Sequence, residues 1–185
     1  GWTVTGFVFL GMTLLVCWFF RDPDRKIPGG KNELVSPADG RVIIIERLAT
    51  CEYLAGPCQK VSIFMNVFNV HVNRIPFDGV VEKVHYTPGK FINASFDKAS
   101  IHNERNALVV RTGADKKFVV VQIAGLIARR IVNCVQAGEQ IIKGDRYGMI
   151  QFGSRLDLYL PLAFEVCVKI GDKTKAGTTV IGIMN

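Results

Sequence analysis

The chain has 185 residues, of which 49% are hydrophobic, so it can bury one sizeable core but is too short for two domains of ordinary size. A net charge of +7 suits nucleic acid, an anionic membrane or an acidic ligand, but the basic residues are scattered and no base-reading motif places aromatics among them, which disfavours nucleic acid. The five cysteines form no C-x-x-C pair and no Cys/His cluster with metal spacing, so we expect reduced thiols and no metal ion.

The first predicted element is an uncharged apolar segment from Trp2 to Phe20. Its length approaches the ~20 residues that a helix needs to cross a bilayer, and Arg21, Arg25 and Lys26 follow it. A buried core helix and a signal peptide are competing interpretations, but a signal peptide would have positive charge before the segment and a small-residue cleavage site after it. We therefore predict a membrane-anchor helix over residues 1–20, either spanning the bilayer or lying in one leaflet. The positive residues after it predict a main domain on the cytoplasmic face of the cell membrane.

A charged, proline-containing linker at residues 21–33 leads into a run of short apolar stretches rich in Val and Ile. Gly, Asp and Pro turns separate these stretches, as is typical of strands in an antiparallel sandwich or barrel. The predicted strands are 41–48, 60–68, 79–86, 107–112, 118–123, 147–152, 156–160, 164–168 and 178–183. One short helix is predicted at 128–135 and one long loop at 89–106. We therefore expect residues 21–185 to form a single, mainly β domain.

Few residues could act as nucleophile or base. Of the three histidines, His71 follows an apolar strand and comes just before the proline in FMNVFNVHVNRIP, although a structural histidine is an equally good interpretation. Asp39 lies in SPADG, whose residues favour a type I turn. Ser154 follows Gly153 in QFGSRLD, and most Gly-Ser pairs of this kind are turns. None of these residues identifies a function by itself.

Taken together and in order, the motifs of the chain resemble those of the phosphatidylserine decarboxylase proenzymes, and most closely those of the shorter subclass. The resemblance is carried by RDPDR, SPADG, FMNVFNVHVNR, GKFINASFDKASIHNERN, AGLIARRIV and GDRYGMIQFGSRLDLYLP, and it extends from Arg21 to the end of the chain. It implies a self-cleaving, pyruvoyl-dependent lyase of phospholipid biosynthesis that converts phosphatidylserine to phosphatidylethanolamine and carbon dioxide. Phosphatidylserine and a membrane are then the expected partners.

The resemblance implies that the chain cuts its own backbone between Gly153 and Ser154. The β chain would comprise residues 21–153 together with the anchor at 1–20, and the α chain residues 154–185. Attack of the serine hydroxyl on the preceding carbonyl gives an ester, β-elimination gives dehydroalanine, and hydrolysis leaves a pyruvoyl group and ammonia. The pyruvoyl group derived from Ser154 would be the electron sink, without a metal or pyridoxal phosphate.

The resemblance also assigns roles to Asp39 and His71, because the family implicates an aspartate of the P-A-D-G block and a histidine of the block matched by VHVNR. His71 would take the proton from Ser154, while Asp39 would fix the imidazole tautomer and support its positive charge. Longer members carry a second histidine three positions on, where this chain has Arg74. Either His71 serves both cleavage and decarboxylation, or Arg74 and water cover one of these tasks. The expected headgroup contacts are Arg74, Asn93, Lys98 and Arg105.

Two other functions fit parts of the sequence. SPADG and the closing hairpin GDKTKAGTTVIG are similar to turns of lipoyl-like and sugar-phosphotransferase sandwich domains, which would make the chain a membrane-tethered carrier or binding module. The Gly-Ser chemistry alone would also permit a pyruvoyl enzyme that decarboxylates a free amino acid, although the apolar amino terminus favours a lipid. The sequence leaves a homodimer open.

Overall fold

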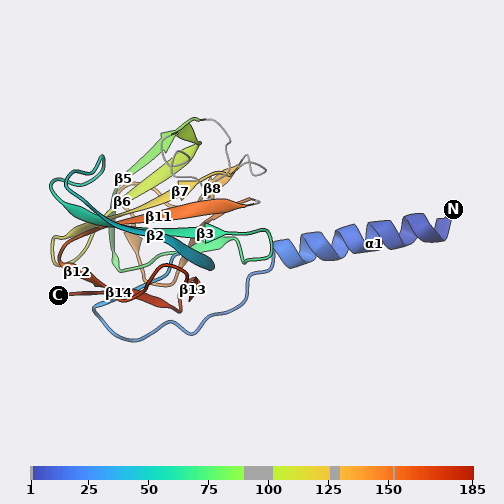
Figure 1. Cartoon of the computed structure of the whole chain (residues 1–185), viewed down its shortest axis with the longest axis horizontal. Coiled ribbons are helices and arrows are strands. Elements are labelled where there is room, and N and C mark those ends of the chain that lie inside the picture. Colours follow the sequence, from blue (N-terminus) through green and yellow to red (C-terminus); the bar gives the residue numbers. More distant parts are fainter. Residues whose placement is uncertain (1, 90–101, 126–129, 152) are drawn as a thin grey trace.

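The fold is described from a computed structural model, which describes residues 2–89, 102–125, 130–151 and 153–185. One helix, α1 (Trp2–Phe19), projects from a mainly β domain (Figure 1). With 18 residues and a rise of about 1.5 Å for each, α1 is about 27 Å long. No helix in this part of the chain is long and apolar enough to span a membrane.

Eight strands form one curled antiparallel sheet in the order β13-β2-β3-β11-β7-β6-β5-β9. Their bounds are β2 (Gly40–Leu48), β3 (Cys58–Met65), β5 (Gly79–Thr87), β6 (Arg105–Arg111), β7 (Lys117–Ile123), β9 (Gln140–Ile141), β11 (Ser154–Pro161) and β13 (Lys173–Thr174). In the middle of this sheet, β11 pairs with β3 on one side and with β7 on the other. Both edges of β11 are therefore hydrogen-bonded to neighbouring strands.

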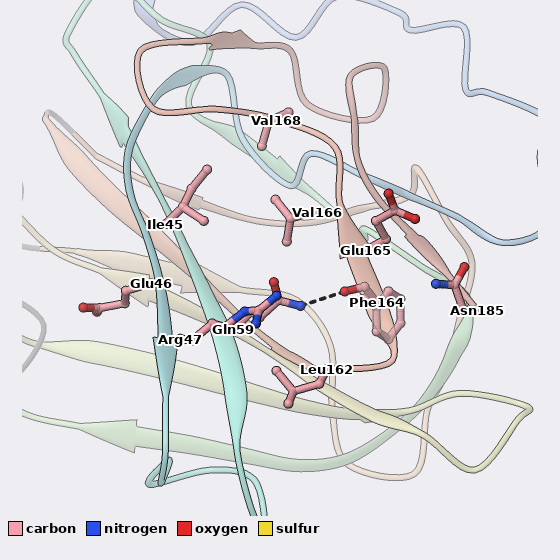
Figure 2. A pocket seen from close by; sticks show the side chains of 10 residues that line it. All are labelled: Ile45, Glu46, Arg47, Gln59, Leu162, Phe164, Glu165, Val166, Val168 and Asn185. Atoms are coloured by element: carbon pink, nitrogen blue, oxygen red, sulfur yellow. Dashed lines mark hydrogen bonds between the residues drawn. The ribbon is translucent and has the colours of Figure 1, made fainter.

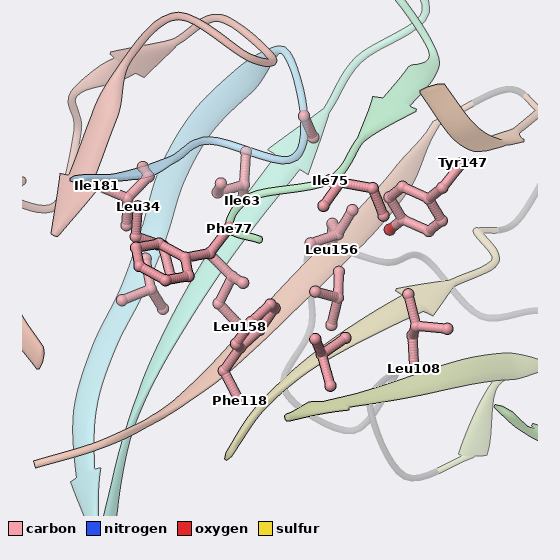
Figure 3. Packing of buried hydrophobic residues seen from close by; sticks show 14 of the residues in the cluster. Leu34, Ile63, Ile75, Phe77, Leu108, Phe118, Tyr147, Leu156, Leu158 and Ile181 are labelled. Atoms are coloured by element: carbon pink, nitrogen blue, oxygen red, sulfur yellow. The ribbon is translucent and has the colours of Figure 1, made fainter. Parts of the chain in front are cut away.

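Two three-stranded antiparallel sheets, β1-β14-β12 and β4-β10-β8, complete the domain. Their bounds are β1 (Glu33–Val35), β4 (Val72–Arg74), β8 (Ile131–Asn133), β10 (Arg146–Ile150), β12 (Phe164–Val166) and β14 (Val180–Met184). Side chains of both small sheets join the main sheet in one hydrophobic core, as Figure 3 shows for Leu34, Ile181, Tyr147 and Leu158. The three sheets therefore form one domain, as predicted for residues 21–185.

The register of β11 decides which way Ser154 points. Alternation along the strand sends Leu156 into the core and Arg155 and Asp157 to the opposite face of the sheet. There Arg155 Nε lies 2.6 Å from Asp157 Oδ1, Arg155 Nη2 donates to Ser62 Oγ at 2.9 Å, and all three side chains are fully buried. A slip by one residue would turn this ion pair into the apolar core, so the register is strongly fixed. Ser154 therefore points to the inner face, like Leu156.

The predicted strands correspond to β2, β3, β5, β6, β7, β10, β11, β12 and β14, which confirms a mainly β fold. The other strands are two or three residues long, too short for an alternating pattern to show. The helix predicted at 128–135 is wrong, because Ile131–Asn133 form β8, whose β-branched residues pair with β10. Residues 128 and 129 lie outside the described part of the chain. The strand predicted at 60–68 ends at Met65, since Asn69 N donates to Asn66 O at 3.0 Å and closes a turn.

Candidate active site

Gly153 and Ser154 lie where the chain passes from one sheet to another. β10 ends at Ile150 in a small sheet, and β11 begins at Ser154, which is paired with Met65 of β3. Gly153 has a φ of +64°, a left-handed conformation that residues with a side chain rarely adopt. Ser154 is completely buried, and its Oγ has no hydrogen-bond partner among the described residues. The bond predicted to break thus joins a left-handed glycine to a serine whose hydroxyl is kept from water.

His71, one residue before β4, is completely buried. Its Nδ1 lies 2.9 Å from the carbonyl oxygen of Asn69, and because a carbonyl can only accept, Nδ1 carries the proton. Nε2 then has the free lone pair, and no group in the described part of the chain is hydrogen-bonded to it. Burial lowers the pKa of His71 to about 4, helped by the positive charge of Arg21 and opposed by the hydrogen bond to Asn69. At neutral pH His71 is therefore an uncharged base.

The carboxyl-terminal end of α1 covers this histidine. Phe19 is only 2% exposed, and its ring centroid lies 4.2 Å from that of His71. Arg21 fixes the end of the helix, because its Nη2 donates to the carbonyl of Phe68 at 2.7 Å. Phe19 thus excludes water from the imidazole. The sequence could not single it out, because an aromatic at the end of an apolar helix is equally typical of a lipid interface.

Asn73 of the neighbouring strand β4 packs against the face of the main sheet on which Ser154 lies. Asn73 of β4 points to this face, because its Oδ1 accepts from Gln122 Nε2 at 2.9 Å and its Nδ2 lies 3.8 Å from the sulfur of Met65, the strand partner of Ser154. His71 comes two residues before Asn73, so the alternation of side chains along a strand predicts the same side for it. Nε2 and Oγ are not hydrogen-bonded to each other in the uncut chain, so proton transfer requires a closer approach or a bridging water.

A row of buried amides holds β4 in this place. Asn106 Nδ2 donates to Gln122 Oε1 at 3.1 Å, and Gln122 in turn donates to Asn73, so the row crosses from β6 through β7 to β4. All three side chains are at most 4% exposed. Because these buried side-chain amides are hydrogen-bonded to one another, they favour a single position of β4 relative to the main sheet. The sequence gives no sign of it, because these residues lie far apart along the chain.

Asp39 holds the linker and not the imidazole. Its carboxylate accepts from Arg25 Nη2 at 3.1 and 2.9 Å and from the backbone N–H of Ala176 at 2.7 Å. Within the described part of the chain no hydrogen bond joins Asp39 to His71, whose Nδ1 is bonded to Asn69 instead. A main-chain carbonyl thus fixes the tautomer, which was the role predicted for Asp39. The prediction that Asp39 supports the positive charge of the imidazole stays a prediction.

An Asp39→Asn substitution separates these two roles. The side chains of Arg25 and Asp39 are 13% and 12% exposed, so loss of the charge pair should lower the free energy of unfolding by about 1–3 kcal/mol in a urea titration. We expect the folded variant to cut itself at the wild-type rate at pH 7, and the exposed Asp115→Asn change to alter neither property. Slow cleavage in a variant that remains folded would instead support a direct role of Asp39 beside His71.

The predicted headgroup contacts Arg74 and Arg105 are engaged inside the protein. Arg74 Nη1 donates to Gly144 O at 2.9 Å, and its Nη2 lies 3.1 Å from Asp22 Oδ1, with 7% of the side chain exposed. Arg105 lies in β6 and not in the predicted loop, and its Nε donates to Tyr53 Oη at 3.2 Å. Both side chains therefore act first as structural ties. The other two predicted contacts, Asn93 and Lys98, lie outside the described residues.

Two cavities border the main sheet at opposite ends. One, of about 580 Å³, lies at the end where β3 leaves the sheet and is lined by Asp39, Arg41 and Phe64, among others. The other, of about 600 Å³, is drawn in Figure 2, where Gln59 Nε2 donates to Phe164 O at 2.7 Å. Gln59 is paired with the far end of β11, so this second cavity lies away from Ser154. Among the described residues, no group of three or more His, Cys, Asp or Glu side chains could hold a metal ion.

A Gly-Ser junction with a buried serine, in a β domain that also holds a buried, uncharged histidine, provides the groups that an enzyme needs if it makes its reactive group from its own backbone. The phosphatidylserine decarboxylase family model matches residues 12–182. The chain is 53% identical over 173 residues to the phosphatidylserine decarboxylase proenzyme of Syntrophus aciditrophicus, covering 94% of this chain and 81% of that protein. For the proenzyme of Geotalea uraniireducens the identity is 50% over 183 residues, covering 99% and 85%. The chain belongs to the phosphatidylserine decarboxylase family, whose members are carboxy-lyases with a pyruvoyl group derived from serine.

Proposed function

We propose that the chain is a proenzyme that breaks its backbone between Gly153 and Ser154 and then converts phosphatidylserine to phosphatidylethanolamine and carbon dioxide. The observation that carries this proposal is the buried Ser154 Oγ, which follows a left-handed glycine and makes no hydrogen bond to the described residues that would have to break before it attacks. An unpaired buried hydroxyl costs about 1–3 kcal/mol, and such a cost in a native core calls for a functional explanation. Identity of about half to named proenzymes supports the same reaction.

In the proposed maturation, Ser154 Oγ attacks the carbonyl carbon of Gly153 while His71 Nε2 takes the hydroxyl proton. The C–N bond breaks as the ester forms, and the nitrogen of residue 154 leaves with a proton as a free amine. Loss of the Cα proton then expels the ester oxygen, so that the carboxylate of Gly153 departs and dehydroalanine remains. Water hydrolyses the enamine, which releases ammonia and leaves the ketone. His71 is suited to each proton transfer because it is uncharged, with Nε2 unpaired.

The surroundings of Ser154 fit a pyruvoyl group. The residue is fully buried, so a ketone formed there is shielded from bulk water, and its position is fixed by the pairing of β11 with both neighbours. When present, the pyruvoyl group supplies an electron sink for the electrons released with carbon dioxide. We propose that His71 also returns the proton to the product carbon, since it is the buried histidine of the three while His85 and His102 are exposed, and that Arg74 serves to position the linker.

The two proposed chains should stay together after the cut. Residues 154–185 would carry β11, β12, β13 and β14, which pair with β3, β7, β2 and β1 of the other chain. Leu156, Leu158 and Ile181 also belong to the common core. The new ends arise at a single junction, so neither the sheet nor the core is opened. A homodimer stays a prediction.

We further propose that α1 attaches the enzyme to a lipid surface, as is typical of this family. Apolar side chains around the helix are exposed, among them Phe7 at 75% and Phe9 at 65%, and Figure 1 shows α1 projecting clear of the domain. Arg21 ties the end of α1 to the loop at Phe68, close to His71. A surface that holds α1 would therefore lie near the active site. The cytoplasmic face stays a prediction from the positive residues after the helix.

Intact-mass analysis of freshly purified protein tests the proposed function. We expect two fragments, of which the smaller begins at residue 154 and lacks a free amino group, and borohydride with an amine should label only that fragment. Phosphatidylserine in micelles should be turned over at least about 100-fold faster than free serine, because lipid contacts contribute to transition-state binding. A chain that stays uncut during incubation would contradict the proposal, and a preference for free serine would remove the lipid from it.

A further inference from the structure

The cavity at the end of β3 is lined by positive charge. Arg41 at the start of β2, Lys173 in β13 and Lys175 just beyond it all line this space of about 580 Å³, and all three are exposed. We call the cavity lined by these three residues the basic groove. Its volume is in the range of pockets that enclose small ligands. The three cations come from two segments that are far apart in the sequence, the start of β2 and the stretch from Lys173 to Lys175.

The positive charge of the basic groove is not balanced by the protein. Among the described residues, no carboxylate forms an ion pair with Arg41, Lys173 or Lys175. The one carboxylate in the lining, that of Asp39, is already taken by Arg25 and by a backbone N–H. Uncompensated cations in a concave surface focus a positive field and attract an anion.

Strand register connects the basic groove to the reactive serine. Lys173 is paired with Arg41, Arg41 with Phe64, and Phe64 with Arg155, the residue that follows Ser154. Strands lie about 4.8 Å apart, so the Cα atoms of Arg41 and Arg155 are about 10 Å apart, a gap that a long arginine side chain and a small headgroup can bridge. Paired residues share a face, so Arg41 lies on the face of Arg155, opposite to that of Ser154. An anion held in the basic groove would thus lie at the end of β11, and a headgroup would reach Ser154 around that strand end.

We propose that the basic groove binds the phosphodiester of the lipid substrate and so directs the serine part of the headgroup toward Ser154. This inference rests on the proposed function and adds to it the residues that recognise the phosphate. Arg41 can offer two parallel donors to phosphate oxygens, while Lys173 and Lys175 act as point charges. Phe68 at the rim is 66% exposed and tied to the end of α1, so the glycerol and acyl part of the lipid can leave the groove toward α1.

The test uses the fully processed enzyme and dihexanoyl phosphatidylserine below its micelle concentration, so that no lipid surface is present. Arg41→Gln and the double change Lys173→Gln/Lys175→Gln should each raise KM at least about tenfold, with kcat within about twofold and self-cleavage complete. sn-Glycerol 3-phosphate should inhibit the wild-type enzyme competitively, more strongly than inorganic phosphate, and lose potency against both variants. Arg47→Gln is the matched control, an exposed arginine on the same strand β2 that borders the other cavity. It should leave KM unchanged.

Three results would overturn the inference. The first is an unchanged KM for the monomeric substrate in both variants. The second is a defect that appears only on anionic vesicles, because it would make the groove a general surface attraction. The third is failure of sn-glycerol 3-phosphate to bind the wild-type chain in titration calorimetry, which needs no catalysis. Failure of the proposed function is seen separately, as an uncut wild-type chain by intact mass before substrate is added.

Discussion

A Ser154→Ala chain should remain one uncut polypeptide and release no carbon dioxide from phosphatidylserine. Without Oγ there is no nucleophile for the carbonyl of Gly153, and without an oxygen on Cβ there is no leaving group for the elimination. Decarboxylation should fall by at least about 10⁴-fold, to the background rate. Intact mass after prolonged incubation and a headgroup assay check both expectations. Cutting of this variant at the same bond would show that another group attacks.

The same change should not destabilise the uncut fold. Ser154 Oγ is buried without a hydrogen-bond partner, so its removal relieves an unpaired polar group and should leave the melting temperature equal or higher. Ser62→Ala is the matched control, because Ser62 Oγ in the neighbouring strand accepts from Arg155 at 2.9 Å. This control should lose about 1–3 kcal/mol of stability and still cut itself. The pair of variants thus separates a hydroxyl kept for chemistry from one kept for structure.

Strands of five or more residues were predictable because alternation of apolar residues records burial on one face. Such a pattern needs several residues, so of the three-residue strands only Phe164–Val166, which lies in a longer apolar stretch, is predicted, whereas Val72–Arg74 is missed and Ile131–Asn133 falls in a predicted helix. The strand state of the last two segments is decided by β10, which lies between them and pairs with both. Sequence preference could not supply that partner, because tertiary pairing overrides local propensity.

The sequence allowed the residues of the candidate site to be named, but not the contacts that hold them in place. Motif resemblance selected Ser154, His71 and Asp39 together, because a Gly-Ser pair, a strand-end histidine and a P-A-D-G turn do not identify a function by themselves. The contact that fixes the imidazole comes from the main chain of Asn69, which any residue type could provide. The cover over the ring comes from Phe19, more than 50 residues earlier in the chain, and the sequence has no signal for such a long-range packing contact.

Replacing the imidazole should stop maturation nearly as completely as removing the hydroxyl. His71→Gln keeps a donor for the carbonyl of Asn69 and a similar volume, but it has no group that can take a proton at neutral pH. Self-cleavage should slow by about 10²–10⁴-fold at pH 7, measured as the decay of the intact mass with time. His85→Gln, which removes an exposed histidine from β5, should cut itself at the wild-type rate. Wild-type cleavage in His71→Gln would exclude His71 as the base.

The pH dependence should reveal which environment the histidine occupies. Burial holds the pKa of His71 at about 4, so the wild-type cleavage rate should be level from pH 8 to about 5 and fall only as the pH approaches 4. In the unfolded chain the group titrates near 6.5, so the unfolded state binds more protons between these values. The free energy of unfolding therefore has its full value, as far as His71 is concerned, above about pH 6.5. It falls by up to about 3 kcal/mol as the pH falls toward 4, because the unfolded chain then binds the proton that the buried imidazole does not. Phe19→Ala, which uncovers the ring, should raise the pKa and move the fall in cleavage rate toward pH 6. A wild-type rate that already halves near pH 6.5 would show that the imidazole is not held in a dry site.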